Sequence, residues 1–175
     1  MSEKNKNIIK DVASYALIII AVFVIRIFIF DPVKVDGPSM DNTLTNGDIV
    51  IINKIGYKKG EIKRYDIVVA EYDHKRIIKR VIGLPNEVIE VKDNKVYADG
   101  KELDNSFAST KTDDFNMADD IGLVKIPGDS YLLMGDHRDV SYDSRYEDVG
   151  TFTKEKIVGK AVFRVWPLNK IGIVK

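Results

Sequence analysis

The sequence predicts a mainly β protein, an antiparallel sheet or barrel-like domain preceded by one N-terminal transmembrane helix. Residues 12–30 are almost wholly apolar, and after residue 31 short apolar runs alternate with turn residues at close intervals. We expect no long helix after residue 30. The 175 residues therefore divide into a tail over 1–11, a membrane anchor over 12–30 and a β-rich domain over 31–175.

The N-terminal segment has the length and charge pattern of an uncleaved signal-anchor. Its apolar run over 12–30 is close to the roughly 20 residues that cross the hydrocarbon core as a helix. Lys4, Lys6 and Lys10 precede it, which favours a cytoplasmic N-terminus, and Arg26 stands near its end, where a cation can reach the headgroups. No small-x-small cleavage site follows the run. We therefore expect a single-pass protein of the cell membrane whose β-rich domain lies outside the cytoplasm.

Seven strands are predicted in the rest of the chain, because short β-branched and aromatic runs are bounded there by Gly, Asn and Asp. The pairs Asp93-Asn94 and Asp99-Gly100 are typical of two-residue hairpin turns. Residues 104–122 are polar and acidic, and we expect them to form a solvated, mobile loop. The predicted strands cover residues 49–53, 65–72, 77–83, 87–91, 95–99, 131–134 and 157–166.

Composition argues against several classes of protein. Lys+Arg and Asp+Glu both number 27, so no basic excess indicates nucleic acid as a partner. The chain has no cysteine, which removes disulfides, thiolate nucleophiles and Cys-ligated zinc. His74 and His137 are its only histidines, and no His-Glu-x-x-His motif is present. We expect a monomer with no metal site and no cofactor.

A serine stands between a Gly-Pro turn and a methionine shortly after the apolar segment. In the string Gly37-Pro38-Ser39-Met40 the glycine widens the backbone freedom and the proline fixes its own φ. The Ser39 hydroxyl and N–H are therefore presented stiffly. Most such strings are ordinary turns, and a hydrolase built on this serine also needs a base for its proton.

Two bases are available, His137 and Lys79. Lys79 lies in a predicted strand, where it shares a face with Ile77 and Val81 while Arg80 shares the other, so we expect one of the two cations to lie against apolar side chains. A free lysine has a pKa of about 10.4, so only about one in 2,500 is neutral at pH 7. Lowering that pKa to near 7 by burial costs about 4.6 kcal/mol, which is seldom met without a functional return.

A third stretch, residues 135–145, is dense in polar side chains and follows an apolar strand. Asp143 and Arg145 lie two apart and can reach each other across a tight bend. Ser141 can donate a hydrogen bond to a neutral amine. Such a loop would brace a site without reacting itself.

Together these stretches resemble the type I signal peptidases, the membrane-anchored Ser/Lys proteases of bacteria, in their compact Gram-positive form. The resemblance rests on an ordered series of boxes behind an N-terminal anchor. Residues 38–44 resemble the nucleophile box and 47–50 its continuation, while 79–85 resemble the general-base box and 135–145 the last box. The resemblance covers nearly the whole chain and leaves residues 101–126 least determined.

The resemblance implies a membrane-bound serine endopeptidase that removes signal peptides from secreted preproteins after small residues, in an Ala-x-Ala pattern. Ser39 would be the nucleophile and Lys79 the general base. Ser141 would orient the Lys79 amine, and Asp143 and Arg145 would form a supporting ion pair.

The resemblance also implies a substrate pocket and an oxyanion hole. Met40, Leu44 and Ile78 match positions that line the small pocket of the family, and the Ser39 N–H would donate to the oxyanion. Gly37 stands where some members carry a serine that adds a second donor. His137 stands where members often carry asparagine.

Other interpretations remain open from the residues alone. A Ser-His-Asp hydrolase would pair Ser39 with His137 and a nearby aspartate. A non-catalytic, membrane-anchored β module would bind a partner and would not need Ser39. Self-cleaving repressors also use Ser/Lys pairs, but the anchor and the neutral net charge argue against them.

Overall fold

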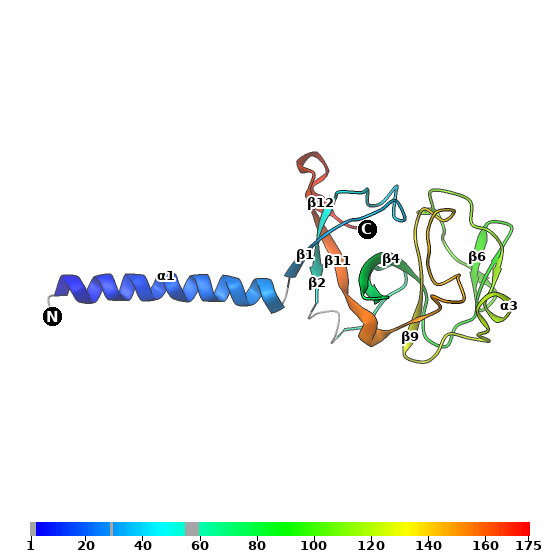
Figure 1. Cartoon of the computed structure of the whole chain (residues 1–175), viewed down its shortest axis with the longest axis horizontal. Helices are drawn as coiled ribbons and strands as arrows, with labels where there is room; N and C mark the ends of the chain where they lie inside the picture. Colours follow the sequence, from blue (N-terminus) through cyan, green and yellow to red (C-terminus); the bar gives the residue numbers. More distant parts are fainter. Residues whose placement is uncertain (1–2, 29, 55–59) are drawn as a thin grey trace.

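The computed structural model describes residues 3–28, 30–54 and 60–175. In the N-terminal helix and the strand after it, side chains are described only for residues 10–22 and from residue 31 onward. The chain comprises one long helix and a β-rich body of two antiparallel sheets (Figure 1). The predicted mainly β, antiparallel class is therefore confirmed.

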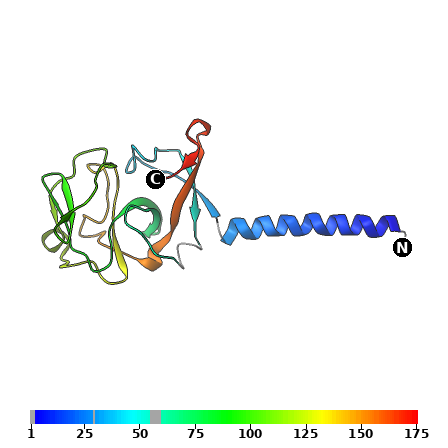
Figure 2. The ribbon, with the colours of Figure 1, turned by 180° about the vertical axis from the view of Figure 1, so that it is seen from behind.

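Helix α1 (Glu3–Phe28) extends away from the β-rich body as a single rod (Figures 1 and 2). It includes most of the expected tail as well as most of the expected anchor. Its described side chains, residues 10–22, are all exposed. Within the part of the chain that the structure describes, no helix is both long and apolar enough to cross a bilayer. The predicted anchor also includes residues 23–30, whose side chains lie outside the described set.

The larger sheet holds eight strands in the order β1-β2-β11-β3-β4-β9-β10, with β12 paired to β11. Its strands are antiparallel, and β11 carries register shifts where it pairs with β2 and β3. Five predicted strands belong to it. The strands 49–53 and 157–166 have the predicted bounds, 65–72 and 131–134 change slightly at their first residues, and 77–83 begins two residues earlier. The bounds are β1 (Phe30–Lys34), β2 (Ile49–Asn53), β3 (Ile67–Tyr72), β4 (Lys75–Gly83), β9 (Ser130–Met134), β10 (Phe152–Thr153), β11 (Ile157–Trp166) and β12 (Gly172–Ile173).

The smaller sheet has the order β7-β6-β5-β8 and lies at the end of the body farthest from α1 (Figure 1). Asp93, Asn94 and Asp99 have positive φ of 52°, 66° and 49°, as the predicted hairpin turns require. The remaining elements are β5 (Ile89–Lys92), β6 (Lys95–Ala98), β7 (Lys101–Glu102), β8 (Phe115–Asn116), α3 (Met117–Ile121) and the 3-10 turns η1 (Lys154–Lys156) and η2 (Leu168–Lys170).

The prediction of a solvated loop over 104–122 holds for its acidic residues and is wrong for its buried apolar residues. Its aspartates are exposed, but Phe115, Met117 and Ile121 are buried in a core cluster with residues of the smaller sheet and of β9. Three separated apolar residues are too few to produce a periodic pattern in sequence. Pairing of β8 with β5 in the smaller sheet and burial against that sheet and β9 order this segment.

A second core cluster lies beneath the segment that follows β1. It joins Met40 and Leu44 of that segment to residues of β2, β3, β4 and β11. Met40 is 1 % exposed and Leu44 is fully buried. Two buried side chains therefore fix the segment that contains Ser39 onto the larger sheet.

Candidate active site

Ser39 lies in a tight turn, residues 38–41, which we call the nucleophile turn. The Asp41 N–H donates to the Pro38 carbonyl at 2.9 Å and closes it. Gly37, just before the turn, has a φ of +89°, a conformation that other residues rarely adopt. Its N–H donates to the side chain of Asn46 at 3.2 Å. The expected stiff presentation of Ser39 therefore has a basis in hydrogen bonds and in buried anchors.

Lys79 lies on β4, whose residue 79 pairs with Val68 of β3. Its Nζ is 2.7 Å from Ser39 Oγ, and its residue is only 4 % exposed. Core clusters pack on both faces of β4, with Ile78 and Ile82 on one face and Val81 on the other. Arg80 is as buried as Lys79. The expectation that only one of these two cations would lie against apolar side chains is thus too narrow.

The electrostatic surroundings of Lys79 favour its neutral form. Burial lowers the pKa of Lys79 from 10.5 to about 8; the negative charge of Asp143 opposes this effect, the positive charge of Arg145 adds to it, and Asp136 opposes it. No described carboxylate lies within ion-pair distance of Nζ. At a pKa of about 8, about one amine in ten is neutral at pH 7.

Residues 135–145, which we call the bracing loop, pack against the nucleophile turn. Asp143 is fully buried, and its carboxylate accepts from the Gly135 N–H at 2.9 Å and pairs with Arg145 Nε at 2.8 Å. Arg145 Nη2 donates to the Arg138 carbonyl at 2.7 Å. The Asp143–Arg145 pair therefore ties together both ends of this loop.

Gly135 allows the loop to approach Ser39 closely. A Cβ at this position would lie 2.2 Å from Ser141 Oγ and 2.4 Å from the Ser39 carbonyl oxygen. Ser141 is buried, and its Oγ has no hydrogen-bond partner among the described residues. The structure places Ser141 next to the nucleophile turn, and its predicted bond to the Lys79 amine is not formed.

Arg80, Asp136 and Thr43 form a buried network that the sequence analysis did not predict. Arg80 Nε and Nη2 lie 2.9 and 2.7 Å from the two carboxylate oxygens of Asp136. Thr43 Oγ1 donates to Asp136 Oδ2 at 2.5 Å, and the Arg80 guanidinium lies 4.4 Å from the centre of the Phe107 ring. The network connects Thr43, just after the nucleophile turn, to β4 and to the bracing loop. The only signal in sequence was the position of Arg80 and Asp136 beside residues already singled out.

His137 does not contact the serine hydroxyl. Its backbone N–H donates to the Ser39 carbonyl at 3.1 Å, and its Nδ1 is 3.2 Å from the Pro38 carbonyl. Ser39 Oγ instead has Lys79 Nζ as its partner. The arrangement therefore lacks the serine–histidine hydrogen bond that a Ser-His-Asp triad requires.

A small cavity of about 130 Å³ opens beside Ser39 and Lys79. We call it the substrate hollow. Met40 and Ile78, two of the predicted pocket residues, line it, whereas the third, Leu44, lies in the core and does not. The lining residues are 33–36, Ser39, Met40 and 76–79.

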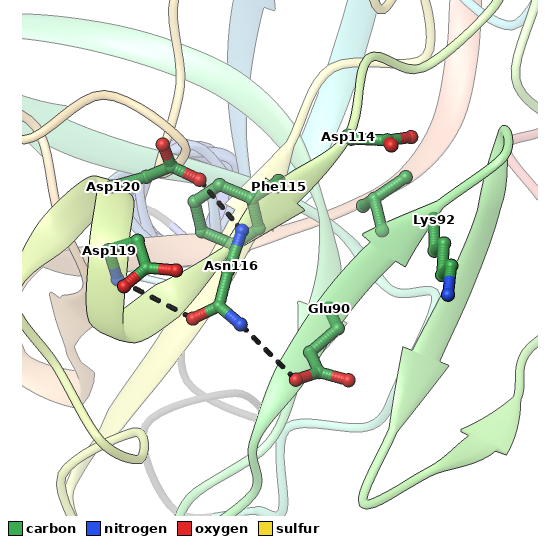
Figure 3. A pocket seen from close by; sticks show the side chains of 8 residues that line it. Glu90, Lys92, Asp114, Phe115, Asn116, Asp119 and Asp120 are labelled. Atoms are coloured by element: carbon green, nitrogen blue, oxygen red, sulfur yellow. Dashed lines mark hydrogen bonds between the residues drawn. The ribbon is translucent and has the colours of Figure 1, made fainter.

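A larger cavity, of about 480 Å³, lies far from these residues in the smaller sheet, between β5, β8 and α3 (Figure 3). Carboxylates gather there, and those of Glu90, Asp114 and Asp120 accept hydrogen bonds from nearby residues of the chain. Asn116 donates to Glu90 at 3.3 Å and accepts from the Asp119 N–H at 3.4 Å, and its own N–H donates to Asp120 at 2.7 Å. None of the predicted site residues lies at this acidic hollow.

Comparison with known proteins gives consistent matches. The family model described as "Signal peptidase, peptidase S26" matches residues 8–166. The signal peptidase I S of Bacillus subtilis is 38% identical, over 96% of this chain and 94% of its own length. The signal peptidase I of Streptococcus pneumoniae is 34% identical, over 95% of this chain and 97% of its own length. A crystal structure of a signal peptidase I from Enterococcus faecalis superimposes with a TM-score of 0.53 at 28% identity, covering 57% of this chain and 96% of that one.

Proposed function

The chain belongs to the peptidase S26 family of signal peptidases and is a protease that removes signal peptides; for its chemistry, we propose that Ser39 is the nucleophile and Lys79 the general base. The observation that carries this proposal is the distance of 2.7 Å between Lys79 Nζ and Ser39 Oγ. The amine is buried, and no described carboxylate forms an ion pair with it. A general base must lie within hydrogen-bond reach of the proton that it removes, and its pKa must allow it to be neutral. Lys79 meets both conditions.

The reaction proceeds through an acyl-enzyme. Neutral Lys79 takes the Ser39 proton as Oγ attacks the scissile carbonyl, and the resulting ammonium gives that proton to the leaving amine. Neutral Lys79 then takes a proton from water, whose oxygen attacks the ester. The ester bond breaks, the proton returns to Ser39 Oγ, and the signal peptide leaves with a new carboxyl end.

The oxyanion hole is built on the backbone of the nucleophile turn. The Ser39 N–H has no acceptor among the described residues, so it is available to the developing oxyanion. Gly37 offers no side-chain donor, and its φ of +89° would strain a serine at that position. The N–H of Ser39 is therefore the donor that we assign.

The substrate binds in extended form between two free strand edges. β1 is the end strand of its sheet, and β4 pairs with β9 only from Arg80 onward, which leaves the edge of residues 75–79 unpaired among the described strands. Asp31 of β1 reaches Arg76 of β4 at 3.1 Å, and the substrate hollow lies along both edges. A peptide added there gains main-chain hydrogen bonds on both sides. A hollow of about 130 Å³ suits an alanine side chain before the cleaved bond, in keeping with an Ala-x-Ala pattern.

Three residues of the bracing loop support the base. The Arg145 charge offsets that of Asp143, which would otherwise raise the Lys79 pKa. Asp143 in turn holds the Gly135 N–H at 2.9 Å and so fixes the turn that touches Ser39. Ser141 Oγ is buried and without a hydrogen-bond partner among the described residues, so its hydroxyl is available to the amine. We assign it the role of orienting the neutral amine.

The N-terminal segment is assigned as the membrane anchor of the enzyme. The apolar sequence over 12–30, the lysines before it and the separation of α1 from the β-rich body support this assignment (Figure 1). The catalytic domain, residues 31–175, would then lie at the outer face of the cell membrane, where exported preproteins emerge.

Cleavage of an Ala-x-Ala preprotein by the detergent-solubilised full chain tests the dyad. We expect Ser39→Ala and Lys79→Ala each to lower the rate by roughly 10³-fold or more, since both groups act in one unit. His137→Ala should retain more than a tenth of the rate. The opposite result, with Lys79→Ala active and His137→Ala inactive, would replace the dyad by a Ser-His pair.

A further inference from the structure

The imidazole of His137 lies between two elements that carry the proposed chemistry. Its Nδ1 faces the Pro38 carbonyl oxygen at 3.2 Å, and that same oxygen accepts from the Asp41 N–H that closes the nucleophile turn. Its Nε2 faces Asp139 Oδ1 at 3.2 Å. The ring therefore joins the turn that holds Ser39 to the bracing loop.

Both ring nitrogens face an oxygen that can only accept a hydrogen bond from them. A neutral imidazole carries one N–H, so one of the two contacts would set a lone pair against an oxygen. The imidazolium carries an N–H at each nitrogen and satisfies both contacts at once. The geometry around this ring is thus matched to its protonated form.

The charges around the ring have the same sign. Asp41 Oδ2 lies 3.7 Å from Nδ1, and Asp139 lies at Nε2. Asp139 Oδ1 is held by the Thr110 hydroxyl at 2.9 Å, so the carboxylate is oriented toward the ring from a third segment. Lys111, the titratable residue beside Thr110, forms no ion pair with a described carboxylate. The two described charged groups in contact with the imidazole are therefore both carboxylates.

We propose that His137 is a positioning residue for the cleavage reaction, whose protonated ring holds the nucleophile turn against the bracing loop and so keeps Ser39 aligned with Lys79. This proposal rests on the proposed role of Ser39. The backbone contact from the His137 N–H to the Ser39 carbonyl is independent of pH. The side-chain contribution is complete when the ring is charged and is weaker when the ring is neutral, because a neutral ring keeps only one of the two hydrogen bonds.

The expected consequence is a pH-dependent effect on kcat. His137→Asn keeps a single polar nitrogen and the backbone contact, but it can never carry the charge. We expect its kcat to be roughly three- to tenfold below that of the unsubstituted chain at the acid end of the profile, the range for one charge-assisted hydrogen bond that is partly exposed. The ratio should be smaller at the alkaline end, where the neutral ring keeps one of its two contacts. KM should change less than kcat, because the ring does not line the substrate hollow.

His74→Asn is the matched control. His74 is the other histidine, it is exposed in the turn between β3 and β4, and its φ of 58° suits asparagine. It removes one titrating imidazole without touching either the turn or the loop. Its kcat should equal that of the unsubstituted chain at every pH.

A double-mutant cycle between positions 137 and 139 decides the proposal. His137→Asn, Asp139→Asn and the double variant are assayed as full chains in detergent across the pH range, with folding checked by Tm. The coupling in kcat should be roughly threefold or more at the acid end and should be smaller at the alkaline end, where the neutral ring can keep only one of its two contacts. Asp139→Asn leaves the ring in place, so its own pH-dependent loss decides the question if His137→Asn fails to fold.

A coupling that is absent, or that is equal at all pH values, would overturn the proposal. Ser39→Ala and Lys79→Ala in the same assay separate this failure from failure of the dyad. If those two variants are inactive while the coupling is flat, only the role of His137 is wrong. If they are active, the nucleophile assignment is wrong as well.

Discussion

Strand β4 carries two buried cations next to each other, and the surroundings of the two differ. Lys79 and Arg80 are 4 % and 3 % exposed. On the Arg80 side, both carboxylate oxygens of Asp136 meet the guanidinium, and the Phe107 ring lies over it. On the Lys79 side no described carboxylate pairs with the amine, and its described hydrogen-bond partner is the Ser39 hydroxyl. At equal burial, the charge of Arg80 therefore has a carboxylate partner, whereas burial lowers the pKa of the unpaired Lys79 amine to about 8.

The two neighbouring residues of β4 therefore have different roles: Arg80 connects segments of the chain, and Lys79 is the proposed base. A buried cation that is fully paired keeps its charge and connects segments of the chain. A buried cation without a partner gains stability by losing its proton, and that is the state a general base needs. The larger acidic hollow also has paired polar groups, because its Asn116 is bonded to both Glu90 and Asp120.

The most severe test of this difference places a guanidinium, which keeps its charge, at position 79. Lys79→Arg cannot lose its proton near neutral pH, so it cannot accept the Ser39 proton. We expect kcat/KM for preprotein cleavage to fall by roughly 10³-fold or more. The reciprocal Arg80→Lys keeps a charge beside Asp136 but loses the two-point pairing and the Phe107 contact, so it should lower stability while lowering activity far less than Lys79→Arg does. Retention of a tenth of the activity by Lys79→Arg would contradict the proposed base.

Removing the paired cation should affect stability most. Arg80→Met leaves Asp136 buried without its partner, which costs about 3–5 kcal/mol in the free energy of unfolding. Urea unfolding of the full chain in detergent measures this loss. The double variant Arg80→Met/Asp136→Asn should recover part of it. A loss below about 1 kcal/mol would show that the pair carries little of the fold.

Removing the unpaired cation, Lys79, should instead raise the free energy of unfolding at neutral pH. The folded pKa of Lys79 is about 8 and its ordinary value is 10.5, so below pH 8 the folded state bears a cost of about 3 kcal/mol at most. Between pH 8 and 10.5 the unfolded state binds more protons, so wild-type stability rises with pH through this window. Lys79→Met should therefore be more stable at pH 7, and its advantage should shrink by pH 10. Urea unfolding at both pH values checks the sign, and lower stability of the variant at pH 7 would refute it.

The smallest expected effect concerns the ion pair next to the base. Arg145 lowers the Lys79 pKa and Asp143 raises it. Arg145→Met should move the acid limb of kcat/KM to higher pH, because cleavage requires the neutral amine. A move of one pH unit would lower the rate at pH 7 about tenfold. Asp143→Asn should move the limb to lower pH, and a shift of both variants in the same direction would exclude an electrostatic role.

Much of this protein could be predicted from sequence because its signals are local. Hairpin turns at Asp93-Asn94 and Asp99-Gly100 follow from residues that tolerate positive φ. The strands follow from short β-branched runs, and the family follows from ordered boxes that each occupy a few consecutive residues. The buried apolar residues of 104–122 were missed because they are few and separated, and because their burial against the smaller sheet and β9 appears only in the folded structure.

The sequence alone determined which side chains carry the proposed chemistry and in what order they occur, since nucleophile, base and bracing residues each stand in a short local pattern. Only the tertiary structure decided their environment. Whether Lys79 or Arg80 meets a carboxylate depends on where residue 136 lies when β9 pairs with β4, and two strands some fifty residues apart in sequence meet only in the folded sheet. Electrostatic character arises from desolvation and distance, and both are properties of the packed molecule.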